Sequence, residues 1–149
     1  MRAAFAQAAP ELREILAKVA EVNLWGLFRH DIAPVWHDGA RVILGDAAHP
    51  TLPFLAQGAN LAIEDGYVLA NCVAGAASIV GGLEQYQTAR KPRVARAIAA
   101  ANANAVNYHL GGLRRRIAHL GLRGIGTFAP DAFTRRLDWL YEFDVTKST

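Results

Sequence analysis

Residues 41–65 combine side chains and spacings that could bind a polar ligand. A short apolar run, Val42-Ile43-Leu44, ends at Gly45-Asp46, and a proline-stiffened loop leads to Gln-Gly-Ala-Asn at 57–60, where a helical pattern begins. Ligands of open α/β sheets lie at the carboxyl ends of strands, and a helix N-terminus offers free backbone N–H groups at the positive end of its dipole. The spacing therefore predicts a site between Asp46 and the helix start for a polar or anionic ligand edge.

The same stretch resembles a motif of a known family. Gly45-Asp46-Ala47-Ala48-His49, followed by Pro53, Gly58-x-Asn60 and Glu64-Asp65, is similar in order and spacing to the second FAD motif of the group A flavoprotein monooxygenases. This is the family of the 4-hydroxybenzoate and salicylate hydroxylases. The resemblance continues at Trp36, at Arg41-Val42, over 86–93 and at 136–141. It implies that residues 1–149 are the C-terminal part of an FAD-binding monooxygenase domain.

The resemblance implies a role for each residue of the motif. Asp46 would accept a hydrogen bond from a ribityl hydroxyl of FAD, and its charge would strengthen that bond. The backbone N–H groups of Gly58, Ala59 and Asn60 would face the N1 and C2-carbonyl edge of the flavin, where reduction places negative charge. Gly45 and Gln57 complete the implied cofactor-binding set.

Pro53 belongs to the implied cofactor-binding set and is also the implied catalytic residue. It would shape the loop beside the flavin ring, close to where the substrate lies, without offering an N–H group there. Taken alone, a proline at this point indicates only a rigid turn.

Most of these residues also have an ordinary structural explanation. Asp46 could cap the turn that follows it, Gly58 could be a turn residue with unusual φ, and Asn60 could be a helix N-cap. We expect His49 to be a structural hydrogen-bonding residue rather than a catalytic base. Glu64 and Asp65 are expected to stabilise the dipole of the first helical turn.

The sequence departs from the family pattern in two ways. Ala56 stands immediately before Gln57, where many relatives have glycine. No strand followed by GxGxxG precedes the motif, so the N-terminal half that binds the ADP moiety is expected to be absent and the isolated chain to bind FAD weakly. The segment 124–129 formally matches GxGxxA but follows no convincing strand, and we interpret it as a glycine-rich connection between helices.

Composition limits the remaining possibilities. Hydrophobic residues make up 52% and charged residues 19% of the chain, the net charge is +3, and there is one cysteine. The five histidines show no metal-ligand spacing, and the arginine clusters lack the interleaved aromatics of a nucleic-acid surface. No apolar run is long enough to cross a bilayer, so a membrane is not an expected partner, and neither is nucleic acid. The single cysteine and the lack of a signal-peptide run at the first residues predict a cytoplasmic protein.

The elements that must position the motif follow from periodicity and turn residues. In the intact enzyme the fold class is expected to be α/β, of the FAD/NAD(P)-binding type, while this chain should be mostly α-helical with a short β segment. The expected elements are a helix over 10–21, a β-prone run over 22–28, a buried strand over 42–44, a helix over 60–75, a helix over 83–110 that Pro92 kinks or splits, and a last helix from Pro130-Asp131 through Leu140.

The resemblance implies that the intact enzyme is reduced by NAD(P)H and uses O2 to hydroxylate a small aromatic acid, such as a salicylate-like compound. FAD is the implied cofactor, and the implied partner is a missing N-terminal FAD-binding half, which could be encoded separately. The alternative is a non-catalytic remnant or assembly module that associates, with itself or another chain, through an exposed apolar face.

Overall fold

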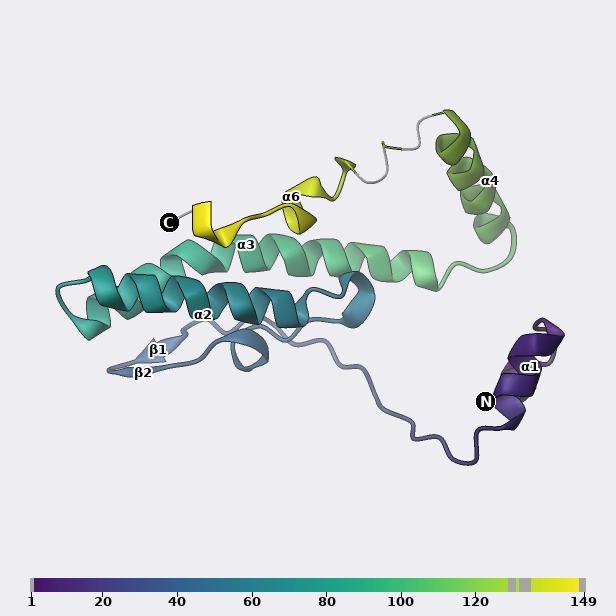
Figure 1. Cartoon of the computed structure of the whole chain (residues 1–149), viewed down its shortest axis with the longest axis horizontal. Coiled ribbons are helices and arrows are strands. Elements are labelled where there is room, and N and C mark those ends of the chain that lie inside the picture. The colour runs from purple at the N-terminus through teal and green to yellow at the C-terminus, as the bar shows by residue number, and fades with distance from the viewer. Residues whose placement is uncertain (1, 129–130, 132–134, 148–149) are drawn as a thin grey trace.

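A hairpin of two long helices forms the centre of the molecule. The structure, a computed structural model, describes residues 2–128, 131 and 135–147. Helix α2 (Gly58–Gly75) and helix α3 (Ile79–Tyr108) are joined by three residues and lie side by side (Figure 1). These helices match the predicted helices over 60–75 and 83–110, with α2 beginning two residues earlier and α3 four residues earlier.

Local sequence explains why the chain reverses between these helices. Ser78 is the N-cap of α3, and its hydroxyl accepts a hydrogen bond of 3.1 Å from the backbone N–H of Gly81. Gly82 lies against α2, where an added Cβ atom would be only 2.8 Å from the Cα atom of Val73. The absence of a side chain at Gly82 therefore allows the two helix backbones to approach closely.

Helix α3 continues through Pro92 as one helix, so the prediction that this proline would split it is wrong. A proline removes one helical hydrogen bond, and contacts made by the residues before and after it with other segments compensate for that loss here. The residues flanking it, Lys91 and Arg93, both bond to other segments: Lys91 Nζ donates to the Pro34 carbonyl at 2.7 Å, and Arg93 reaches Glu64.

Within the described residues, the β structure is limited to a two-stranded antiparallel hairpin. Strand β1 (His37–Asp38) pairs with β2 (Arg41–Val42), and Gly39 makes the turn with φ +56°. The predicted buried strand over 42–44 is confirmed only at Val42, which lies in β2. The Ile43 N–H still donates to the Trp36 carbonyl at 2.9 Å, but Ile43 and Leu44 lie outside the strand and are 37% and 36% exposed, so the prediction that the run is buried is wrong. Among the described residues no further strand lies beside this hairpin to bury that run.

The core forms where the helical hairpin of α2 and α3, the β1–β2 region and the C-terminal segment meet. Its largest buried apolar side chains are Trp36, Leu61, Tyr86 and Leu140. Helix α6 (Asp138–Tyr141) and the 3-10 turn η4 (Val145–Lys147) bring the C-terminal segment back along the helical hairpin (Figure 1). Part of the predicted last helix, including Pro130 and Phe133, lies outside the described residues.

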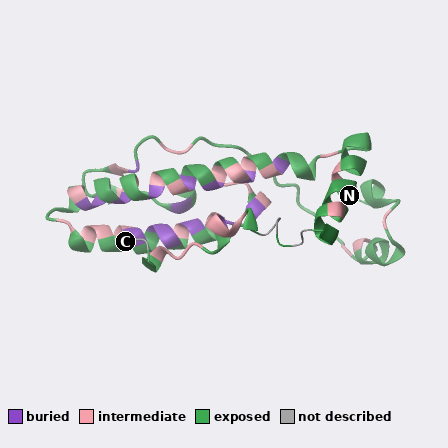
Figure 2. Ribbon diagram, turned by 90° about the horizontal axis from the view of Figure 1, so that it is seen from above, coloured by how far each residue is buried: buried purple, intermediate pink, exposed green. Residues whose placement is uncertain are grey.

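The N-terminal segment and helix α4 lie beyond this core. The 3-10 turn η1 (Arg2–Phe5), helix α1 (Pro10–Ala17) and helix α4 (Gly112–Phe128) contain no buried residue (Figure 2). Helix α1 ends four residues before its predicted end. The predicted glycine-rich connection over 124–129 is wrong as far as the structure describes it, because residues 124–128 belong to α4 and residue 129 lies outside the described residues. Since none of the described strands directly precedes it, the GxGxxA match is no nucleotide-binding turn.

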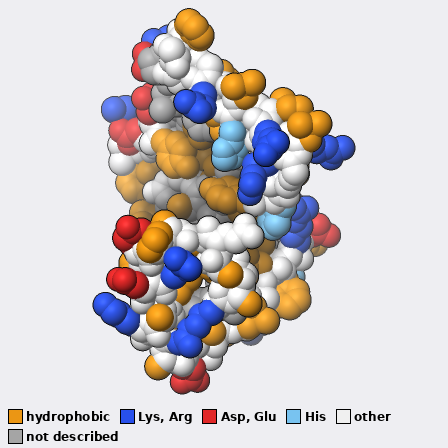
Figure 3. Space-filling model, turned by 90° about the vertical axis from the view of Figure 1, so that its right-hand side faces the viewer, with side chains coloured by type: hydrophobic (Ala, Val, Ile, Leu, Met, Phe, Trp, Pro, Cys, Tyr) orange, Lys and Arg blue, Asp and Glu red, His pale blue; other side chains and the backbone are white. Residues whose placement is uncertain are grey.

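The β-prone run over 22–28 is extended but forms no strand. Its side chains are largely exposed: Leu24 is 100% and Trp25 83% accessible. A strand needs a neighbour to satisfy its backbone groups, and none of the described segments provides one. Hydrophobic side chains also lie exposed among Lys and Arg at this end of the molecule (Figure 3).

Candidate functional site

Most residues of the predicted site line one open hollow, which we call the Asp46 hollow. It has a volume of about 520 Å³ and lies between the 3-10 turns η2 (Gly45–Ala47) and η3 (Pro53–Leu55) and the first turns of α2. Its lining residues are Leu44, Gly45, Asp46, Thr51, Pro53, Ala56, Gly58, Ala59 and Ala62. The fold thus brings together five of the seven residues predicted to bind the cofactor.

The turn η2 presents the Asp46 carboxylate to this hollow. Gly45, which precedes it, has φ +56°, and an added Cβ atom there would lie 3.0 Å from the Ala62 Cβ atom of α2. Glycine is needed here for both its conformation and its size. Asp46 is exposed, and no described residue hydrogen-bonds its side chain, so it does not cap the turn and its carboxylate is free to accept a ligand donor.

The N-terminus of α2 supplies donors on the opposite wall. The first helical hydrogen bond runs from the Leu61 N–H to the Gln57 carbonyl at 2.9 Å. The N–H groups of Gly58, Ala59 and Asn60 come before it and have no acceptor within the helix. These three N–H groups and the positive end of the helix dipole suit an electron-rich ligand edge.

Gln57 and Asn60 lie beside the hollow rather than in its lining. Gln57, the N-cap residue, is buried and makes no side-chain cap. The Asn60 amide donates to Gln57 Oε1 at 3.3 Å and to Glu64 Oε1 at 3.5 Å. The alternative prediction that Asn60 is the N-cap is therefore wrong, and its side chain braces the first turn instead.

The unusual φ that was one explanation for Gly58 is found at Ala56 instead. Gly58 does not have a positive φ; an added Cβ atom would lie 3.4 Å from Thr51 Oγ1 and 3.9 Å from Asp46 Oδ1. What Gly58 contributes is open space at the helix terminus. The left-handed residue is Ala56, with φ 52° and ψ 35°, which explains in physical terms why glycine suits that position.

A buried charged cluster lies directly behind the hollow. Asp65 is fully buried: its Oδ2 atom accepts from the Gly45 N–H at 3.0 Å and contacts His49 Nε2 at 2.5 Å, and its Oδ1 atom accepts from Arg90 Nε at 2.7 Å. Burial by itself raises the pKa of Asp65, but the bonds from His49, Arg90 and Gly45 outweigh it and hold the pKa below its usual value. Because an ionised carboxylate only accepts, the proton in the contact with His49 is on Nε2.

Glu64 completes the cluster and pairs with a second guanidinium, that of Arg93. Arg90 Nη2 lies 2.8 Å from Glu64 Oε2, and Arg93 donates to both Glu64 oxygens at 2.7 Å. The prediction that Glu64 and Asp65 stabilise the first turn is wrong, because they are the seventh and eighth residues of α2 and face α3. The prediction that His49 is a structural hydrogen-bonding residue is confirmed.

Sequence reasoning missed the partners of these carboxylates. Arg90 and Arg93 lie 25 and 29 residues beyond Asp65 and Glu64. One local signal was present: two adjacent acids on one predicted helix and two arginines three residues apart on the next could meet if those helices packed together.

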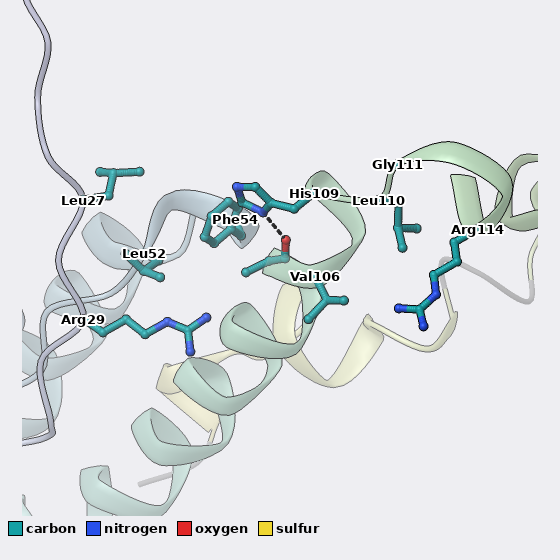
Figure 4. Close-up of a pocket in the computed structure, with 10 residues that line it drawn as sticks. Leu27, Arg29, Leu52, Phe54, Val106, His109, Leu110, Gly111 and Arg114 are labelled. Atoms are coloured by element: carbon teal, nitrogen blue, oxygen red, sulfur yellow. Dashed lines mark hydrogen bonds between the residues drawn. The ribbon is translucent and has the colours of Figure 1, made fainter. Parts of the chain in front are cut away.

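A second open hollow, the Phe54 hollow, lies on the other side of η3. It has a volume of about 580 Å³ and is lined by Leu27, Arg29, Leu52, Phe54, Ala105, Val106, His109, Leu110, Gly111 and Arg114. Figure 4 shows that these residues come from three separate segments of the chain and that His109 Nδ1 points at the Ala105 carbonyl, 2.8 Å away. Apolar walls flanked by two guanidinium groups would suit an aromatic anion.

Comparison with known proteins is consistent with the motif and the fold. A family model described as an FAD binding domain matches residues 3–101. The 3-amino-4-hydroxybenzoate 2-monooxygenase of Streptomyces cremeus is 40% identical over 109 residues, which cover 72% of this chain and 28% of that enzyme. The 6-hydroxynicotinate 3-monooxygenase of Pseudomonas fluorescens is 45% identical over 73 residues, covering 49% and 19%.

A third relative aligns with nearly the whole chain. The 3-hydroxybenzoate 6-hydroxylase 2 of Aquipseudomonas alcaligenes is 30% identical over 142 residues, which cover 95% of this chain and 43% of that enzyme. The chain therefore spans less than half the length of these relatives. Over the described residues, no helix is long and apolar enough to cross a membrane, and no group of acidic, His and Cys side chains could hold a metal ion.

Proposed function

Because this chain belongs to the family of FAD binding domains, we propose that it holds the isoalloxazine and ribityl end of FAD in the Asp46 hollow of an aromatic-acid monooxygenase. The observation that carries the proposal is the meeting of a free carboxylate, Asp46, with the unpaired N–H groups that open α2. When bound, FAD supplies the redox and oxygen chemistry, and the protein supplies position and electrostatics.

The residues present fit this end of FAD. Asp46 offers a charged acceptor, which suits a hydroxyl donor such as those of the ribityl chain. The first N–H groups of α2 offer donors to a carbonyl edge, and they stabilise negative charge there without a cationic side chain. Pro53 lines the same hollow and presents a rigid ring with no N–H group.

The relatives suggest the substrate class. Their names identify hydroxylated benzoates and a hydroxynicotinate as the compounds on which those enzymes act. We propose a small hydroxylated aromatic acid for the enzyme to which this chain belongs, with NAD(P)H as reductant. The Phe54 hollow is a suitable place for the acid, because Phe54 directly follows Pro53 and Arg29 and Arg114 are available to a carboxylate.

The ADP end of FAD requires a further partner surface. The relatives extend well beyond the part that aligns with this chain. We propose that an N-terminal FAD-binding half, on the same polypeptide or another, supplies the ADP site and covers the exposed run over 22–28. Apolar residues on both alternating faces of that run, such as Leu24 and Trp25, suit a strand covered on both sides.

Titration of the 149-residue chain with FMN and with FAD, followed by amide NMR shifts, tests the proposal. Both flavins should shift the resonances of Asp46 and Gly58 and should bind weakly and equally, because the adenosine end of FAD finds no site. Binding of FAD a hundred-fold tighter than FMN would contradict the proposal that the ADP end of FAD is bound by a partner surface and not by this chain. Shifts confined to other residues would contradict the site.

Asp46→Ala measures the contribution of the carboxylate to flavin affinity. Loss of a hydrogen bond to a charged acceptor should weaken FMN binding by about 1.5–3 kcal/mol, roughly ten- to a hundred-fold. Asp38→Ala is the matched control, since Asp38 is an exposed aspartate on β1 outside the hollow. If the two variants bind FMN equally well, Asp46 is not the flavin ligand.

The exposed apolar residues favour a second candidate, an assembly module without catalysis. Leu113, Ile117, Leu120 and Phe128 recur along α4 and are 62–89% exposed. Sedimentation of the chain alone separates the candidates: an assembly module forms a defined oligomer without binding flavin. The monooxygenase part binds FMN whatever its oligomeric state.

A further inference from the structure

We propose that Asp65, held by Arg90 and His49, is a positioning residue that fixes the Asp46 turn at a set distance from the N-terminus of α2. The expected effect on flavin binding rests on the proposed function, but the geometry of the turn does not depend on flavin. Asp65 lies outside the Asp46 hollow and would act only through the backbone of Gly45.

Both backbone polar groups of Gly45 are clamped. Its N–H donates to Asp65 Oδ2 at 3.0 Å, and its carbonyl accepts from the N–H groups of Ala48 and His49, both at 2.9 Å. The peptide unit on each side of Gly45 is thereby fixed immediately before Asp46. The direction in which Asp46 leaves the turn therefore depends on the bond to Asp65.

Asp65 is itself held from two directions. Arg90 of α3 donates to Oδ1 at 2.7 Å, while His49 contacts Oδ2 from within the same turn that Asp65 holds. The ring of Trp36 packs against His49 with 5.3 Å between ring centroids and restricts the imidazole. The carboxylate therefore links three segments: the turn, α2 and α3.

Helix α2 serves as a rigid spacer between the two walls of the hollow. It carries the free N–H groups at Gly58 and the clamp at Asp65, seven residues later, or roughly 10 Å along the helix axis. The close approach of Gly45 to Ala62 fixes a second point of the same helix against the turn. Because one helix holds both walls, the spacing of acceptor and donors is set without a flexible connection.

The neighbouring Glu64 provides a matched control. Both carboxylates are buried, both pair with Arg90, and they are adjacent on α2, but Glu64 has no bond to the Gly45 turn. Glu64→Gln therefore disturbs the same ion cluster and leaves the clamp in place. Asp65→Asn weakens the acceptor for the Gly45 N–H.

The test compares these variants in the 149-residue chain by hydrogen exchange at the Gly45 amide and by FMN titration. In Asp65→Asn, Gly45 exchange relative to amides of α3 should rise, and the FMN dissociation constant should increase, each by about ten-fold. In Glu64→Gln both should stay within two-fold of the unaltered chain even if the thermal midpoint falls. Equal effects in both variants, or unchanged Gly45 exchange in Asp65→Asn, would overturn the proposal.

Two further results keep the test decisive. If Asp65→Asn does not fold by circular dichroism, Arg90→Lys is measured instead: it keeps the charge but loses the Nε bond to Asp65, and faster Gly45 exchange with weaker FMN binding is again expected. Unchanged Gly45 exchange in that variant would count against the proposal. If the unaltered chain binds no FMN, the proposed function fails, while Gly45 exchange still decides whether Asp65 positions the turn.

Discussion

Residues 33–108 and the described end of the chain, 135–147, differ sharply from residues 2–31 and 109–128. All the residues classed as buried in the described part of the chain lie within the first region, whereas the second region has none, although it carries Leu24, Trp25, Phe28 and the apolar side chains of α4. Apolar content alone therefore does not decide what forms a core. The first region has two long helices whose apolar and charged side chains pack against one another, and the second exposes apolar side chains that the described residues do not bury.

The largest expected effect comes from the charged cluster, where the two regions differ most. Arg90→Met should destabilise the chain by about 3–5 kcal/mol in urea unfolding, because two buried carboxylates lose their shared partner. Lys147→Met, which removes the exposed pair with Asp144, should leave the unfolding midpoint unchanged. Equal losses in both variants would show that burial does not distinguish these ion pairs.

A pair of leucines tests the comparison in the apolar part. Leu61→Ala, at a fully buried residue, should cost about 2–5 kcal/mol of unfolding free energy because it leaves a cavity in the core. Leu24→Ala, at a fully exposed residue, should change it by less than about 0.5 kcal/mol. If Leu24→Ala were as costly as Leu61→Ala, the run over 22–28 would already have a partner in the isolated chain.

Glycines in the helical hairpin give a smaller effect with opposite signs. Gly82→Ala places a Cβ atom against the backbone of Val73 and Cys72 and should destabilise the hairpin by about 1–3 kcal/mol. Gly66→Ala, with no atom within 4 Å of the added Cβ, should stabilise α2 by about 0.5–1 kcal/mol. Thermal unfolding measures both, and a loss in Gly66→Ala would contradict the view that α2 is open there.

The sequence predicted the parts that depend on local pattern. Periodicity located α3 because its buried positions recur at helical spacing, as Tyr86, Arg90 and Val94 do. It also located α2, but the apolar face that carried that prediction, which includes Ile63 and Tyr67, is exposed, and α2 buries its Leu61, Asp65 and Val68 face instead. The motif located the Asp46 hollow because its residues lie within a short stretch that folds on itself. In each case the information was contained within one or two elements.

The remaining features depend on contacts between distant residues. The pairing of Asp65 with Arg90 spans 25 residues, and no local rule shows that two expected helices bring these charges together. A buried strand over 42–44 needs a neighbouring sheet, and β propensity therefore predicted more strand there than the two residues Arg41 and Val42 that form β2. The β-prone run over 22–28 has no partner strand among the described residues and forms no strand. The split that was one of the two outcomes predicted at Pro92 does not occur, because the contacts of Lys91 and Arg93 offset the cost of the proline.

The smallest expected effect concerns a strained point inside the well-packed region. Ala56 has φ 52° and is exposed, so its methyl group gains little from packing while its backbone is in the left-handed region. A non-glycine residue there costs roughly 1–2 kcal/mol, and glycine would lose about 0.4–1 kcal/mol through the greater entropy of the unfolded chain. Ala56→Gly should therefore stabilise the chain by about 0.5 kcal/mol.

Ala59→Gly is the matched control for this substitution, because Ala59 is also exposed and lines the same hollow but has a helical backbone. Glycine in the first turn of α2 should cost about 0.5–1 kcal/mol, the opposite sign to Ala56→Gly. Urea unfolding of both variants in parallel cancels any shared effect of removing a methyl group from the hollow. If both variants are destabilised equally, the left-handed backbone at Ala56 is not strained. Alanine would then fit this exposed position without a conformational cost, just as Leu61 fits its position in the core.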